Sequence, residues 1–171
     1  TTGYIMPRKS IAQRINPARS RVQLSFMLSK ADNDLVRDYR FTQIMTTQNT
    51  ELSLSDVIDD VFAAFREYLE KPAVIISRED ISDKREYRAV FYLRQEDADL
   101  LKEFRLKKIL STQNVNFNMT AAMGQILDVF RHTLKQRGYE LMRRPDIVRA
   151  AESQISRKRK KTLSSEEAES Q

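Results

Sequence analysis

The chain has 171 residues, of which 40% are hydrophobic and 32% charged, a balance typical of a globular protein with a solvated surface. It has no cysteine, so disulfides, zinc ribbons, iron–sulfur clusters and thiol chemistry are excluded, and no apolar run approaches the roughly 20 residues that a membrane span needs. The net charge of +6 is gathered mainly at the two ends of the chain, which is typical of nucleic-acid binding, although solubility alone accounts for it equally well.

Residues 1–21 are predicted to form a flexible basic arm. The segment has five basic residues, no acidic residue and two prolines, and it lacks both a helical and a strand period. It also lacks the apolar core of a signal peptide. Such an arm is well placed to reach along a DNA backbone. Its candidate phosphate-contacting residues are Arg8, Lys9, Arg14, Arg19 and Arg21.

Residues 22–69 are predicted to form a strand followed by two helices. The strand has period 2, so one of its faces is apolar. The apolar face comprises Val22, Leu24, Phe26 and Leu28, and the opposite face comprises Gln23, Ser25 and Met27. A helix is expected over about residues 31–48, ending near Asn49, and a second helix is expected to begin at an N-cap, either Ser53 or Ser55.

The same order recurs after a linker over residues 70–86. Residues 22–69 align with residues 87–134 at a constant shift of 65 and without a gap, so the second half is expected to span residues 87–137. Identical pairs include Phe26 with Phe91, Arg40 with Arg105, and Phe65 with Phe130.

The second half has its own alternating strand and helix signals. Its apolar strand face comprises Tyr87, Ala89, Phe91 and Leu93, and its opposite face comprises Arg88, Val90 and Tyr92. A helix is expected over about residues 96–113, ending near Asn114, and the next helix has Asn118 or Thr120 as its N-cap and is stopped by Gly138.

One strand and two helices cannot bury both the strand edges and the apolar helix faces. Two such halves can bury these surfaces together if their strands pair antiparallel and their four helices cover one face of the resulting ribbon. We therefore expect a mainly α protein with a two-stranded antiparallel β-ribbon, in which two halves fused in one chain fold together as a pseudo-dimer.

This doubled strand–helix–helix pattern resembles the ribbon-helix-helix DNA-binding proteins of the Arc and MetJ type. The resemblance covers residues 22–69 and 87–134, and it departs from that family in fusing both halves. The tandem arrangement with a basic tail is also similar to the overdrive-binding proteins of the Agrobacterium VirC operon, which are associated with T-DNA transfer. In the family, the ribbon enters the major groove and the second helices grip the backbone.

The resemblance and the strand alternation together predict two classes of DNA contact. A ribbon in the major groove would read bases with the strand face directed away from the core. The candidate base-contacting residues are Gln23, Ser25, Met27, Arg88, Val90 and Tyr92. The starts of the second helices would bind phosphate, although simple helix capping is an equally good reading. These residues are Ser53, Ser55, Asn118 and Thr120.

Residues 138–171 are predicted to be an extension with a short helix from about Pro145, a basic cluster at residues 157–161, and a disordered acidic end. The acids Asp59 and Asp60, which have no counterpart in the second half, are expected to be solvated. The only histidine, His132, lies in an apolar helix stripe, and no nucleophile motif, phosphate loop or metal-ligand spacing occurs. We therefore expect no enzymatic activity, no metal and no cofactor.

The expected function is sequence-selective binding of double-stranded DNA, as an accessory factor in conjugative or T-DNA transfer, in a cytoplasmic bacterial protein. A relaxase or a partner ATPase of the transfer system is the expected protein partner, and no membrane is involved. A transcriptional repressor or plasmid partition protein of the same fold is the alternative, and a protein–protein adaptor is a further one. The pseudo-dimer is expected to be monomeric, and its association on DNA stays open.

Overall fold

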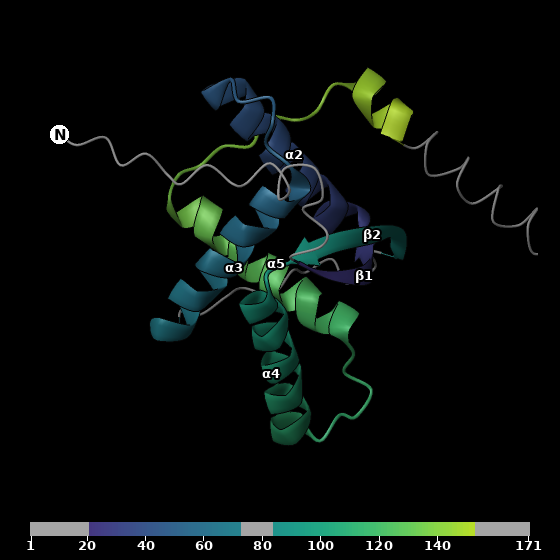
Figure 1. The fold of residues 1–171 in the computed structure, drawn as a ribbon, viewed down its shortest axis with the longest axis vertical. Coiled ribbons are helices and arrows are strands. Elements are labelled where there is room, and N and C mark those ends of the chain that lie inside the picture. Colours follow the sequence, from purple (N-terminus) through teal and green to yellow (C-terminus); the bar gives the residue numbers. More distant parts are fainter. Residues whose placement is uncertain (1–20, 73–83, 153–171) are drawn as a thin grey trace, which may run out of the picture.

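The computed structural model describes residues 21–72 and 84–152, in which a strand and two helices occur twice. The elements in chain order are β1 (Val22–Ser29), α2 (Lys30–Thr47), α3 (Leu54–Glu70), β2 (Arg85–Leu93), α4 (Gln95–Thr112) and α5 (Met119–Gln136) (Figure 1). The predicted order of elements is confirmed. The predicted contacts Arg8, Lys9, Arg14 and Arg19, and the basic cluster at residues 157–161, lie outside the described residues.

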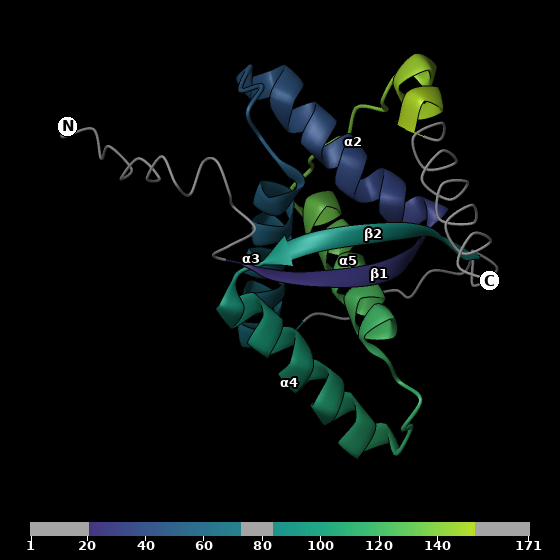
Figure 2. The same cartoon turned by 45° about the vertical axis from the view of Figure 1, so that its right-hand side comes forward.

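The two strands pair antiparallel as a two-stranded ribbon, as predicted. One face of the ribbon is buried in the core, where Phe26 and Phe91 are 1% and 2% exposed and their rings lie 5.7 Å apart. Leu28, Ala89 and Leu93 are buried with them. Figure 2 shows the ribbon running across one side of the molecule, with α2 and α4 flanking it. Burial of this apolar face drives the packing of the helices onto the ribbon.

Each first helix ends one residue earlier than predicted. The left-handed caps are Gln48 and Gln113, with φ of 59° and 58°, and their backbone N–H groups donate to carbonyl oxygens four residues earlier at 2.8 Å. The asparagines that follow, Asn49 and Asn114, instead use their side-chain oxygens to accept from the backbone N–H two residues further on, at 3.1 Å in both repeats. These Asx turns start the loops to the second helices.

The two repeats contact each other through equivalent residue pairs. Each of these contacts between the first repeat and the second has a counterpart in which the two repeats exchange roles. Arg131 of α5 binds Asp32 of α2 at 2.8 Å, and Arg66 of α3 binds Asp97 of α4 at 2.5 Å. The ring contacts follow the same rule, with Tyr39 on Phe130 at 5.0 Å and Phe65 on Phe104 at 5.1 Å. Corresponding residues in these pairs differ by the repeat shift of 65. Reciprocal contact of this kind is the property of a two-fold interface.

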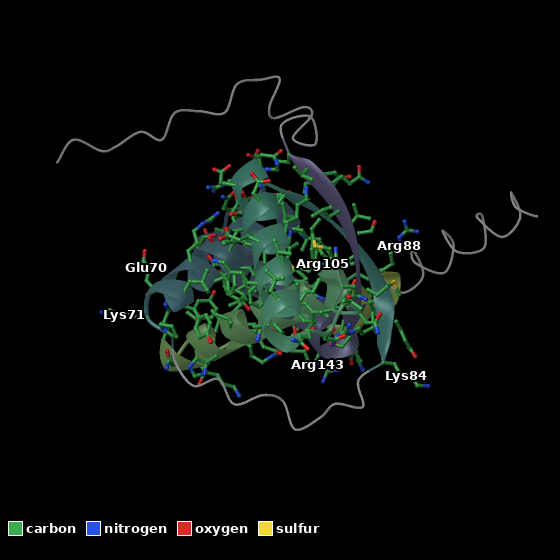
Figure 3. The ribbon with its side chains drawn as sticks, turned by 90° about the horizontal axis from the view of Figure 1, so that it is seen from below. Glu70, Lys71, Lys84, Arg88, Arg105 and Arg143 are labelled. Atoms are coloured by element: carbon green, nitrogen blue, oxygen red, sulfur yellow. The ribbon has the colours of Figure 1, made fainter. Side chains whose placement is uncertain are left out.

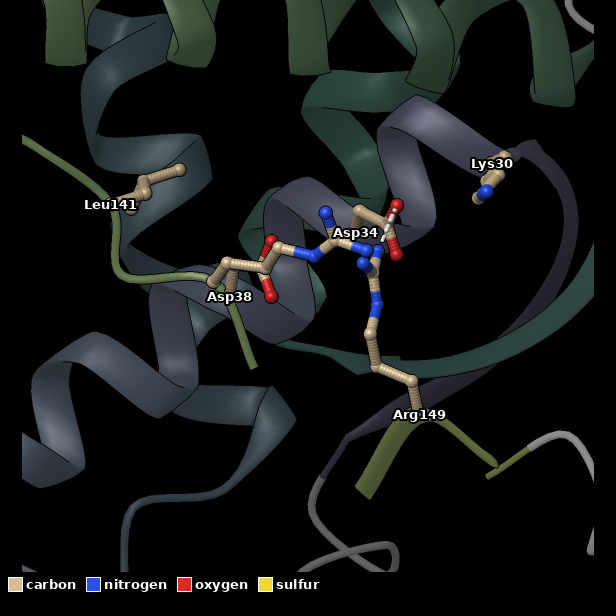
Figure 4. A pocket seen from close by; sticks show the side chains of 6 residues that line it. Lys30, Asp34, Asp38, Leu141 and Arg149 are labelled. Carbon is tan, nitrogen blue, oxygen red and sulfur yellow. Dashed lines mark ion pairs between the residues drawn. The ribbon is translucent and has the colours of Figure 1, made fainter. Parts of the chain in front are cut away.

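Residues 138–152 break this symmetry because they pack on α2. The turn after α5 uses Gly138 at φ 66°, and residues 146–152 are helical, as expected. Arg144 is 4% exposed, and its guanidinium lies 2.6 Å from Asp38. Arg149 binds Asp34 at 2.5 Å beside a hollow of about 330 Å³ (Figure 4). The two acids that line the hollow, Asp34 and Asp38, pair with Arg149 and Arg144, which indicates a structural role.

Among the described residues, no equivalent segment covers α4, where Leu106 and Leu110 are 55% and 69% exposed. None of the described helices is long and apolar enough to cross a membrane.

Candidate nucleic-acid interface

The outer face of the ribbon points away from the helices. It consists of three neighbouring cross-strand pairs, which are Gln23 with Tyr92, Ser25 with Val90, and Met27 with Arg88. Cross-strand partners share a face, and residues two apart along a strand share it too. The prediction that these six residues lie together on one face of the ribbon is confirmed.

The outer face combines hydrogen-bonding groups with apolar surface. Gln23, Ser25, Met27 and Arg88 are exposed, while Val90 and Tyr92 are partly buried by their neighbours. Met27 is 40% exposed. A large apolar side chain on an uncovered ribbon favours association with another surface, so its exposure is typical of a binding face. The Arg88 side chain makes no hydrogen bond or ion pair with the rest of residues 21–72 and 84–152, so its donors are available to a ligand.

The second helices start beside the ribbon. Ser53 and Asp56 form a reciprocal capping box at the start of α3, in which the Ser53 N–H donates to Asp56 at 2.9 Å. At the start of α5, the Asn118 side chain accepts from the Ala121 N–H at 2.8 Å. The prediction of N-caps at Ser53 and Asn118 is therefore confirmed, and their contact with phosphate stays a prediction.

Thr120 ties the start of α5 to the ribbon. Its hydroxyl oxygen accepts a hydrogen bond from the backbone N–H of Met27 at 3.3 Å, on the free edge of β1. Ser55 is the corresponding residue at the start of α3, and it is partly buried. The start of α5 has no acidic residue in its first turn, whereas that of α3 has Asp56. An acid there opposes the binding of a phosphate, so the two helix starts are not equivalent.

Arg21 is held by an acid. Its guanidinium binds both oxygens of Asp59 in α3, at 2.8 and 2.9 Å, and its side chain is 10% exposed. Arg94 binds the same carboxylate at 3.2 Å. Burial by itself raises the pKa of Asp59, but the two guanidinium groups outweigh burial, so that its pKa lies below the ordinary value. This geometry does not favour Arg21 as a phosphate ligand.

The expectation that Asp59 and Asp60 are merely solvated is wrong. Asp59 binds two arginines, and Asp60 accepts a hydrogen bond from the Tyr39 hydroxyl at 2.8 Å. Burial and this hydrogen bond raise the pKa of Tyr39 well above its ordinary value. Both partners lie far away in sequence, so local patterns carry no sign of these contacts.

Arg85 is a residue that sequence reasoning missed. The strand register shifts between Leu28 and Ser29, so that Tyr87 pairs with Leu28, Arg85 pairs with Ser29, and Glu86 has no partner in the ladder. β2 therefore starts at Arg85, two residues before the predicted start of the second half.

Arg85 reaches toward Gly124 of α5, which is the counterpart of Asp59. A methyl group at residue 124 would lie 3.9 Å from the Arg85 Nη2 atom. Thus Arg85 approaches α5 where Arg21 approaches α3, but no carboxylate receives it. The gapless repeat aligns Glu86 with Arg21 and conceals this correspondence, although the adjacent cations Lys84 and Arg85 are visible in the sequence.

The fold and this surface define a mainly α protein with one two-stranded antiparallel ribbon, whose uncovered face carries mixed hydrogen-bonding and apolar side chains. Comparison of the chain with protein families, with curated proteins and with solved structures finds no match.

Within the described residues, no group of three acidic or histidine side chains could hold a metal ion. His132 is partly buried, and its Nε2 atom makes no hydrogen bond there.

Proposed function

We propose that this chain is a single-chain, pseudo-dimeric ribbon-helix-helix protein that binds double-stranded DNA, with its ribbon in the major groove. The observation that carries the proposal is the set of three cross-strand pairs on the helix-free face of the ribbon. A two-stranded ribbon fits the major groove of B-form DNA, where all four base pairs can be distinguished. The reciprocal contacts between the repeats support the pseudo-dimer.

The side chains of the outer face match the chemistry of base edges. The Arg88 guanidinium can donate two parallel hydrogen bonds to guanine, and the Gln23 amide can pair with adenine. Met27 and Val90 can pack on thymine methyl groups, and Ser25 can hydrogen-bond to several bases. The ribbon thus carries groups for base recognition, while the second-helix starts carry groups for phosphate.

A role in conjugative or T-DNA transfer, with a relaxase or ATPase as partner, extends this proposal. A transcriptional repressor or partition protein would use the same surface on a different DNA site. Mapping the sites that the protein occupies on DNA separates these roles, since a promoter, a partition locus and a transfer origin lie in different places. If the protein does not bind duplex DNA, the adaptor alternative gains support, and the exposed Leu106 and Leu110 on α4 are where a partner search would begin.

The test compares Arg88→Ala with Lys71→Ala on the best-bound duplex selected from a random-sequence pool and on a scrambled duplex. Both changes remove one exposed cation, and Lys71 lies on the side of the molecule opposite Arg88 (Figure 3). Arg88→Ala should weaken binding to the selected duplex by roughly tenfold or more, because a bidentate arginine contact contributes about 1–3 kcal/mol of discrimination. Lys71→Ala should leave both affinities unchanged.

Equal losses on both duplexes for Arg88→Ala would mean that Arg88 contacts only the DNA backbone. An unchanged affinity would exclude the ribbon as the reading element. A wild-type protein that binds no duplex at low salt would refute the proposed function as a whole.

A further inference from the structure

We infer that the two ends of the ribbon hold the DNA backbone unequally, so that the chain lies on its duplex in one preferred orientation. This inference rests on the proposed function. One end, called the cationic end, carries Lys84, Arg85 and Arg88 at the start of β2. The other, called the neutralised end, carries Arg21 and Arg94 with Asp59 between them.

At the neutralised end, the arginine charges are already compensated. Arg21 binds Asp59 through two hydrogen bonds and is almost enclosed, and Arg94 shares the same carboxylate. Asp56 adds a second negative charge in the first turn of α3, where a phosphate would otherwise meet the helix start. A phosphate approaching this end meets two carboxylates, the nearly buried guanidinium of Arg21, and the guanidinium of Arg94, which is 51% exposed but is held by Asp59.

At the cationic end, the positions that correspond to Asp59 and Asp56 carry no acid, because they are Gly124 and Ala121. Arg85 lies beside Gly124, and Lys84, Arg85 and Arg88 are all exposed and make no ion pair within the described residues. Figure 3 shows Lys84 and Arg88 projecting outward on the β2 side of the molecule. Glu86 is the one acid within this stretch of β2, so three cations face a single carboxylate.

The start of α5 adds to the difference. Thr120 holds it against the free edge of β1 at Met27, the cross-strand partner of Arg88. With no acid in its first turn, this helix start places backbone N–H groups and the positive end of its dipole near the cationic end. Two features therefore coincide at one end, which are the arginines left without an acid at Gly124 and the acid-free start of α5.

The cross-strand pairs proposed to read bases also differ between the two ends of the ribbon. The repeat shift relates Gln23 to Arg88 and Met27 to Tyr92, so one end presents arginine with methionine and the other presents glutamine with tyrosine. The chemistry of these groups selects guanine at the cationic end and adenine at the neutralised end. The DNA class that fits this ribbon is an imperfect inverted repeat with distinguishable half-sites, read in one direction.

The charge at residues 59 and 124 tests the inference. Gly124→Asp places a carboxylate beside Arg85, at the position that corresponds through the repeat to Asp59 beside Arg21. Gly124→Asn is its uncharged control. The added Cβ makes ordinary contacts, and aspartate is no worse than glycine inside a helix, so the fold should persist. Asp59→Asn does the reverse, because it releases Arg21 and Arg94.

The affinity for the selected duplex is measured at a series of salt concentrations. Gly124→Asp should weaken binding and reduce the slope of log K against log salt by about 0.9, the value for one phosphate fewer neutralised by the protein, while Gly124→Asn should leave the slope unchanged. Asp59→Asn should strengthen binding and steepen the slope. If the wild type binds but neither charge change alters the slope, the inference fails and the proposed function stands. If the wild type does not bind, both fail.

Orientation is read directly with a DNA-cleaving reagent on a single cysteine, since the natural chain has none. The two substitutions are Lys30→Cys and Gln95→Cys. Both residues are exposed, and they correspond through the repeat shift. They lie just after β1 and β2, at opposite ends of the ribbon. Each should cleave only one flank of the selected duplex, and the two flanks should differ. Cleavage of both flanks by each reagent would overturn the inference.

Discussion

Replacement of Phe26 by alanine tests the assignment of the inner and outer faces of the ribbon. Phe26 is 1% exposed at the centre of the inner face, in contact with Phe91. Removal of a buried phenylalanine side chain costs about 3–5 kcal/mol, because apolar burial is forfeited and a cavity is left behind. In a domain of this size, each kcal/mol lowers the Tm by about 2–4 °C, so a fall on the order of 10 °C is expected.

The matched control is Met27→Ala, one residue further along β1 on the outer face. The free energy of unfolding should change by less than about 0.5 kcal/mol, because surface substitutions without special contacts lie in this range. Both variants are compared with the wild type by urea denaturation and thermal melts followed by circular dichroism. If Met27→Ala destabilised the protein as much as Phe26→Ala, the two faces would be inverted and the reasoning refuted.

The two rings offer a further measurement on the same assignment. Phe26 and Phe91 come from different repeats, with centroids 5.7 Å apart. A double-mutant cycle with Phe26→Leu and Phe91→Leu should give a coupling energy of about 0.5–1.5 kcal/mol, as measured for aromatic pairs elsewhere. Additive effects would mean that the rings do not meet across the ribbon.

The protein should be a monomer in dilute solution without DNA, because the linker of residues 70–86 keeps its two strands at high effective concentration; a dimer mass in light scattering would contradict this. Arg144→Ala should expose residues 138–152 to limited proteolysis, since it leaves Asp38, whose side chain is only 14% exposed, without its ion-pair partner. Arg143→Ala removes a side chain that is 72% exposed and should not have this effect; equal cleavage of both variants would contradict the role of Arg144. The folded-state pKa of Asp59 lies below its unfolded value, so its charge stabilises the fold above about pH 4 and loses that effect as the pH falls through the folded-state pKa. The stability difference between wild type and Asp59→Asn should therefore shrink in acid when followed by urea denaturation, and a difference independent of pH would show that the charge of Asp59 is not responsible.

Local patterns were sufficient for the elements and for the faces of the ribbon. The alternation around Phe26 and Phe91 predicted which strand residues are buried, because successive side chains of a strand point to opposite faces. The helix bounds were predicted to within one residue at the ends of α2 and α4. Pairing between the strands followed from the repeat, since one half alone cannot cover its strand edges.

Contacts between distant residues were out of reach of these patterns. Arg144 meets Asp38 across 106 residues, and Arg21 meets Asp59 across 38. Neither a periodicity nor a spacing rule relates such positions. The register shift that skips Glu86 also depends on how the two strands meet, so the correspondence of Arg85 with Arg21 could not be taken from the gapless alignment.

The amino-acid sequence by itself determined the doubled strand–helix–helix architecture and the six residues of the outer face, because hydrophobic periodicity and internal repetition are properties of short stretches of chain. The tertiary structure alone decided which cations are free and which are paired. Arg21 and Arg85 look alike in the sequence, yet one binds Asp59 and the other lies beside Gly124. The physical reason is that the interaction between charges depends on their distance in space and on their exposure to water, and both are set only when the helices pack on the ribbon.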